Sequence, residues 1–168
     1  MGTAVESVGW DISMGIANTK LGRMLLKATS SEKSLAPESM EHVAIKIFGS
    51  LYEYGDWGIL KTEIPDSGKL KSRYPVGKVR NLHKLGETTK TREEFEAWIE
   101  ELNQGDFKGS KYHVVKNSCI VWATLACHFL GVPYPPNWDK IRAYAKKNNK
   151  VANALGASVM SSRKSSED

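Results

Sequence analysis

Residues 112–131, YHVVKNSCIVWATLACHFLG, change their hydrophobic period at one point. The first part alternates as a β-strand does, and the part after Ser118 is mostly apolar, as in a buried helix. Ser118 is a favourable N-cap, Gly131 is a favourable residue just past a helix end, and the prolines of the following VPYPPNW forbid continuation. The pattern predicts a short strand over residues 111–115 and a helix from Cys119 to about Leu130.

The other periodic segments predict further strands and helices in a mixed order. They are a strand over 7–12, a helix within 13–28 capped at Asn18 or Thr19, a hairpin opened by His42 with its turn at Gly49–Ser50, a long connection over 56–77 with room for a short strand, a strand over 78–85, a helix behind the Thr91/Glu94 capping box, and a last helix from residue 137 or 138 to 147. This order predicts an α+β domain with a small antiparallel sheet packed against helices.

Length and charge narrow the class of protein. A chain of 168 residues suits one domain, which we place at residues 5–150, with a disordered tail over 157–168. There is no apolar run of membrane-spanning length and no secretory signal, so we expect no membrane insertion and a cytoplasmic location, with the nucleus as a second one. The net charge is +5, but cations and acids are interleaved, so we expect no nucleic-acid partner. A homodimer is left open.

The two cysteines differ in position more than in type. In one helix Cys119 and Cys127 would lie about 12 Å apart along the axis, too far for a disulfide. Neither cysteine has metal-ligand spacing to a histidine, so we expect no metal and no cofactor. A thiol on the first turn of a helix is where a thiolate is easiest to form, which favours Cys119 as a nucleophile and leaves Cys127 as an inert core thiol.

A nucleophilic cysteine needs a base, and four histidines compete for that role. His128 is on the same helix as Cys119, His113 is on the strand before it, and His83 lies among cations, which disfavour an imidazolium. His42 follows a loop at the start of a strand, where functional side chains are commonly presented. A lone histidine at a strand start is more often structural, so spacing alone leaves the pair of Cys119 and His42 undecided.

Three segments together resemble the PPPDE family of cysteine isopeptidases, also described as deSUMOylating isopeptidases. WDISMGIA, residues 10–17, is similar to the family's YDLS-x-G-x-A motif, and HVAIKIFGSLYEYGDWGI, residues 42–59, is similar to its strand that begins with His and its GxEYxxG-x-GI motif. LGETTKTREEFEAWIEELNQGDFKGSKYHVVKNSC, residues 85–119, resembles the family's G-x-T segment, helix and approach to the nucleophile. The resemblance covers roughly residues 8–138.

The resemblance implies a permuted papain-like fold in which the catalytic histidine precedes the cysteine. The catalytic pair then falls on His42 and Cys119. Where members commonly carry Asn on both sides of the cysteine this chain reads NSCI, and where they carry a small GSGGI-like loop it reads GDWGI. The candidates for binding substrate or stabilising an oxyanion are Asn117, Ser118, Ile120, Trp57, Gly58 and Trp10.

The resemblance implies a thiol protease that removes ubiquitin-like modifiers, SUMO or ubiquitin, from lysine side chains. The expected partners are therefore protein conjugates of such modifiers. A second interpretation keeps the same residues and makes the protein a thioesterase that removes acyl chains from cysteines, which would need an apolar groove beside Cys119. A third is a non-catalytic adaptor that binds a modifier.

Overall fold

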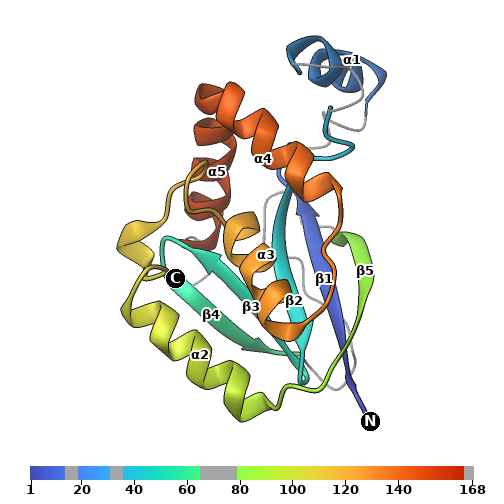
Figure 1. Cartoon of the computed structure of the whole chain (residues 1–168). Helices are drawn as coiled ribbons and strands as arrows, with labels where there is room; N and C mark the ends of the chain where they lie inside the picture. The colour runs from blue at the N-terminus through green and yellow to red at the C-terminus, as the bar shows by residue number, and fades with distance from the viewer. Residues whose placement is uncertain (14–18, 31–35, 65–78, 165–168) are drawn as a thin grey trace.

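The structure is a computed structural model that describes residues 1–13, 19–30, 36–64 and 79–164 (Figure 1). A sheet of five strands in the order β4-β3-β2-β1-β5 forms its centre, and neighbouring strands in it pair antiparallel. Helices pack against this sheet and above its upper end in the view of Figure 1. The α+β class predicted from the sequence is confirmed.

The central hairpin is built by β2 (Glu41–Ile47) and β3 (Ser50–Gly55). Its turn is Phe48–Gly49, one residue earlier than predicted, and both residues have positive φ, 52° and 75°. This backbone is the mirror-image turn whose twist matches paired strands, and glycine at its second position avoids the steric cost that Phe48 bears. The hairpin fixes which residues of β2 and β3 share a face.

Three more strands complete the sheet. β1 (Thr3–Asp11) starts earlier than predicted and pairs with β2 on one side and with β5 (Val79–Thr88) on the other. β4 (Gly58–Glu63) is the short strand for which the long connection left room, and it pairs with β3. The rest of that connection, residues 65–78, lies outside the described residues.

Four helices agree with their predicted positions, and their caps explain their ends. They are α1 (Lys20–Thr29), α2 (Arg92–Gln104), α3 (Cys119–Leu130) and α4 (Asn137–Lys147). The capping box between Thr91 and Glu94 starts α2 as predicted. The Ser118 side chain accepts from the Val121 N–H at the start of α3, and Gly131 ends that helix in the left-handed conformation.

Two segments differ from the predictions. The strand expected over residues 111–115 is wrong: Gly109–Lys111 forms a 3-10 turn (η3), and the following loop closes by paired backbone hydrogen bonds between His113 and Asn117. A helix, α5 (Asn149–Lys164), follows α4 and extends into the range where a disordered tail was expected. Residues 165–168 lie outside the described residues.

The main core lies between the sheet and helices α2 and α3. Val43, Ile45 and Ile47 of β2 face it, and Trp122 and Ala126 contribute from α3. Trp98 of α2 stacks on Phe129 of α3 at a ring separation of 4.5 Å, which ties the two helices together. A smaller apolar cluster, Val8, Trp10, Ala44 and Leu51, also packs on the sheet. This packing fixes the N-terminal end of α3 against the sheet.

Candidate active site

Cys119 is the first residue of α3 and is 6% exposed. The first intrahelical hydrogen bond of α3 runs from the Trp122 N–H to the Ser118 carbonyl, so the N–H groups of Cys119 and Ile120 precede the helical ladder. Such groups and the helix dipole stabilise negative charge. The thiol therefore lies where both a thiolate and an oxyanion on an attacked carbonyl would be favoured.

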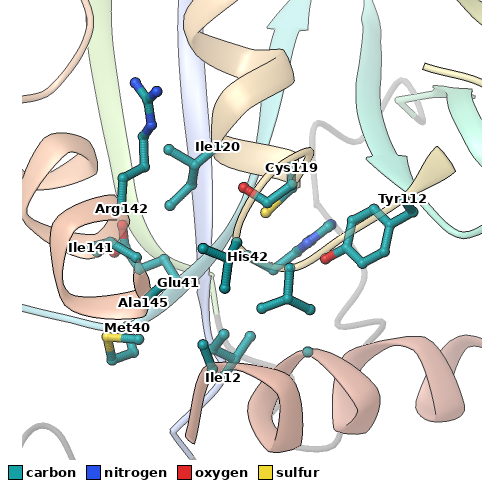
Figure 2. Close-up of a pocket in the computed structure, with 15 residues that line it drawn as sticks. Ile12, Met40, Glu41, His42, Tyr112, Cys119, Ile120, Ile141, Arg142 and Ala145 are labelled. Carbon is teal, nitrogen blue, oxygen red and sulfur yellow. The ribbon is translucent and has the colours of Figure 1, made fainter. Parts of the chain in front are cut away.

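His42 is the second residue of β2 and is 1% exposed. It pairs with Trp10 of β1 across the sheet, and the two rings lie 6.0 Å apart. The ring of Trp57 meets the imidazole edge-on at 6.5 Å. Two indole rings thus restrict the positions that the imidazole can take. Figure 2 shows His42 beside Cys119, one residue from the sheet and the other from the helix.

Glu53 of β3 is the third member of this group, and sequence reasoning missed it. Its Oε2 lies 2.9 Å from Nε2 of His42, and both side chains are only 2% exposed. The imidazole of His42 also interacts with the Cys119 side chain by charge and by a hydrogen bond. The sequence did contain a signal for this residue: in LYEYG an acidic residue stands between two tyrosines in an apolar strand, where a charged side chain is rarely buried without a partner. Cys119, His42 and Glu53 form a chain of three polar side chains.

The pKa of His42 reflects this environment. Burial lowers the pKa, but the charge and hydrogen bond of Cys119 and the hydrogen bond and charge of Glu53 outweigh it and raise the pKa of His42 to about 10. The imidazole is therefore favoured as a cation between two groups that can carry negative charge. This arrangement suits a thiolate–imidazolium pair, the form in which a cysteine is a nucleophile.

A small pocket of about 40 Å³ adjoins Cys119 and His42, and Figure 2 draws its lining residues as sticks. Its walls are mostly apolar and come from the end of β1, the start of β2, the loop before α3, the first turn of α3, and helices α4 and α5. The apolar lining residues include Ile12, Met40, Val114, Val115, Ile120, Ile141, Ala145 and Ala152. Such a volume suits a few water-sized groups. Only a thin chain could reach Cys119 through the pocket in this conformation.

Comparison with protein families places most of the chain in one family. A family model described as "PPPDE putative peptidase domain" matches residues 18–157. The chain belongs to this PPPDE peptidase family. The matched range contains His42, Glu53 and Cys119, whereas the whole WDISMGIA segment, residues 10–17, lies before it. Comparison with curated proteins found no match.

In this PPPDE domain the other candidate residues around the cysteine have distinct surroundings. Ser118 and Ile120 line the pocket, although the Ser118 hydroxyl also caps α3 and Ile120 packs in the core. Asn117 does not line the pocket. Its side-chain amide donates to the Tyr54 hydroxyl at 3.1 Å and to the carbonyls of Asp106 at 2.8 Å and Lys111 at 3.1 Å. The side chain of Asn117 thus holds the loop before α3 in place.

The aromatic and glycine candidates are not among the residues that line the pocket. Trp57 belongs to the turn between β3 and β4, and its ring covers Gly55 so closely that a Cβ there would lie 2.5 Å from it. A Cβ on Gly58, which has φ +91°, would lie 2.9 Å from the side-chain oxygen of Asn103. Trp10 and Trp57 therefore contact the ring of His42 rather than forming the wall beside Cys119, and Gly58 lies beside Asn103.

The second cysteine of the PPPDE domain has the environment expected of a core thiol. Cys127 is fully buried, and burial raises its pKa to about 12. Both cysteines are free. His113 accepts hydrogen bonds from the Val115 and Lys116 N–H groups through Nδ1, and His83 and His128 are exposed. Of the four histidines, the described geometry brings His42 to Cys119.

Neither a cluster of metal ligands nor a membrane-spanning helix occurs in the part of the chain that the structure describes. Residues 1–13, 19–30, 36–64 and 79–164 contain no group of three or more side chains of His, Cys, Asp or Glu that could hold a metal ion. Over the same part of the chain no helix has both the length and the apolar character needed to span a bilayer.

Proposed function

We propose that this PPPDE domain is a cysteine isopeptidase that removes ubiquitin-like modifiers from lysine side chains. The observation that carries the proposal is the buried sequence of contacts from Cys119 to His42 to Glu53, beside a narrow pocket. It supplies a nucleophile, a base and a group that orients the base, the three roles that acyl transfer by a thiol requires.

In the proposed reaction the Cys119 thiolate attacks the carbonyl carbon of the modifier's C-terminal glycine. The N–H groups at the start of α3 donate to the resulting oxyanion. His42 gives its proton to the leaving lysine amine, and the C–N bond breaks to leave a thioester on Cys119. His42 then takes a proton from water, whose attack on the thioester releases the modifier and the free thiol.

The size of the pocket supports a substrate with small residues next to the scissile bond. Two consecutive glycines have no side chains and can enter a space that larger residues cannot. Cys119 and His42 are nearly inaccessible to solvent, which favours an extended tail over a folded surface as the group that reaches them. Ubiquitin-like modifiers with a Gly-Gly terminus are therefore the proposed substrate class.

A panel of ubiquitin and SUMO probes carrying a C-terminal electrophile tests the proposal. We expect a covalent adduct at Cys119, identified by peptide mass spectrometry, with at least one modifier. Cys119→Ser should form none, and Cys127→Ser is the matched control that should react as the wild type does. An adduct that persists in Cys119→Ser would contradict the assignment, and modifier binding without any adduct would favour the adaptor.

A thioesterase is the second candidate because the pocket beside Cys119 is lined mainly by apolar side chains. An acyl chain could lie against Ile120 and Ile141 while its thioester carbonyl meets Cys119. Turnover of a fluorogenic modifier amide compared with that of a fluorogenic acyl thioester separates the two candidates. Preference for the amide supports the isopeptidase, and turnover of the acyl thioester alone supports the thioesterase.

A further inference from the structure

Helix α1 lies at the edge of the domain in Figure 1 and is held by a small part of its surface. Gly22 and Leu26 are its buried residues, and Leu26 joins the main core. At its C-terminal end the Thr29 hydroxyl donates to the Tyr144 hydroxyl at 3.1 Å, and the Asn148 amide donates to the Thr29 carbonyl at 3.3 Å. One face and one end thus fix α1 to α4, and the remaining surface faces solvent.

Part of that remaining surface is apolar. Leu21, Met24 and Leu25 are 61%, 60% and 51% exposed. They stand at positions i, i+3 and i+4, so they share one side of the helix, while the buried Gly22 and Leu26 share another. Three large apolar side chains exposed together on one element are uncommon on a soluble surface and mark a place where something binds.

The rest of the surface is cationic. Lys20, Arg23 and Lys27 are exposed and stand at i, i+3 and i+7, a third side of the helix that borders the apolar one. The helix sequence KLGRMLLKAT contains no Asp or Glu. The apolar side of α1 therefore lies next to a positively charged side. A complementary partner would be anionic and would also accept apolar side chains.

We infer that α1 binds the surface of an anionic bilayer, lying in the plane of the headgroups. A bilayer offers anionic phosphates above hydrocarbon within the depth of one helix, which matches a cationic side adjoining an apolar side. The convex, peripheral position of α1 suits a flat surface. Because α4 contributes Ile141, Arg142 and Ala145 to the catalytic pocket and α1 is bonded to α4, the bound helix would hold that pocket near the membrane.

Co-sedimentation of the full chain with phosphatidylcholine vesicles, with and without phosphatidylserine, tests this inference without using any catalytic readout. We expect binding to the phosphatidylserine vesicles at about 0.1 M NaCl and much weaker binding at about 0.5 M, because salt screens the charges. Combined replacement of Leu21, Met24 and Leu25 by Ser should weaken binding at least ten-fold, as should combined replacement of Lys20, Arg23 and Lys27 by Gln.

Matched controls separate α1 from general properties of the surface. The double variant Leu82→Ser, Leu125→Ser removes exposed apolar side chains outside α1. The triple variant Lys146→Gln, Lys147→Gln, Lys150→Gln removes three exposed cations, as many as the α1 charge variant does. Both control variants should bind as the wild type does. The inference is overturned if the wild type does not bind phosphatidylserine vesicles, or if the control variants lose as much binding as the α1 variants. It is also overturned if replacing Leu21, Met24 and Leu25 by Ser changes the oligomeric state in light scattering instead of vesicle binding. That result would make the apolar stripe an interface between copies of the chain.

Discussion

The imidazole of His42 and the carboxylate of Glu53 meet across two adjacent strands, with 2.9 Å between Nε2 and Oε2. Ala44 pairs with Glu53 in the sheet, and His42 stands two residues before Ala44, so His42 and Glu53 are diagonal neighbours on one face. The turn at Phe48–Gly49 sets this register. A shift of one residue would move Glu53 to the opposite face and leave the imidazole without its partner.

Glu53→Gln should reduce kcat/KM and change its pH dependence. The pKa of His42 is raised to about 10, so the imidazolium persists through neutral pH and is lost as the pH rises through that value. Removing the carboxylate charge removes part of what raises the pKa, so the alkaline limb of kcat/KM should move to lower pH. We expect kcat/KM at pH 8 to fall roughly ten- to a hundred-fold, since changing one member of a coupled group is costly.

Glu63→Gln, an exposed change on β4, is the control and should leave kcat/KM as in the wild type. If the alkaline limb of Glu53→Gln did not move, the proposed role of Glu53 would be contradicted.

Cys119 should alkylate selectively with iodoacetamide at pH 6. Cys119 is the first residue of α3 and lies beside the His42 imidazole (Figure 2), which can take up the thiol proton as the cysteine reacts. Cys127 should stay unmodified because it is fully buried and burial raises its pKa to about 12. His42→Ala should slow the reaction of Cys119 roughly ten-fold or more. Peptide mass spectrometry measures both sites, and equal labelling of the two cysteines would count against the pair.

Asn117→Ala should destabilise the domain more than it impairs catalysis. The amide of Asn117 holds the loop before α3 through the Tyr54 hydroxyl and two carbonyls. Losing these hydrogen bonds should lower the free energy of unfolding by about 1–3 kcal/mol, measured by urea denaturation. Well below the melting temperature we expect less than a ten-fold fall in kcat. A fall of about 10²–10³-fold with unchanged stability would instead identify Asn117 as an oxyanion donor.

Gly156→Leu should loosen α5 from the pocket wall. A Cβ at Gly156 would lie 2.2 Å from Cγ2 of Val114, so the helix or the loop must move. We expect a loss of about 1–3 kcal/mol in unfolding free energy and faster alkylation of Cys119 by a bulky maleimide. Ala157→Leu, an exposed change on the same helix, should affect neither. Unchanged or slower alkylation in Gly156→Leu would show that α5 does not limit access to the thiol.

The helices that sequence reasoning located are those whose ends carry recognisable capping residues. α2 begins at a capping box, and α3 runs from Ser118 to Gly131, so side-chain and backbone rules that act within one turn were enough. Cys119 was favoured over Cys127 as the candidate nucleophile by the same reasoning, since position on a helix can be inferred from spacing. Family resemblance, rather than periodicity, singled out His42.

What sequence reasoning missed depends on contacts between distant segments. The β-branched pair Val114–Val115 predicted a strand, but this loop is closed by the His113–Asn117 bridge and has no neighbouring strand in the described structure. The segment from residue 157 onward is rich in small and polar residues, which suggested disorder, yet α5 continues to Lys164. Before that segment, Ala152 and Gly156 of the same helix lie one turn apart at the pocket. Glu53 was overlooked because its role arises only when β2 and β3 pair.

The proposed nucleophile and base belong to elements 77 positions apart in sequence, a helix and a strand joined only through the packed core. A compact state that keeps its helices and strands but loosens its core would therefore separate the thiol from the imidazole. In mild acid or denaturant, rapid labelling of Cys119 at low pH should disappear before the far-UV circular dichroism of the helices does. The reactivity of this one thiol thus serves as a built-in reporter of native tertiary packing.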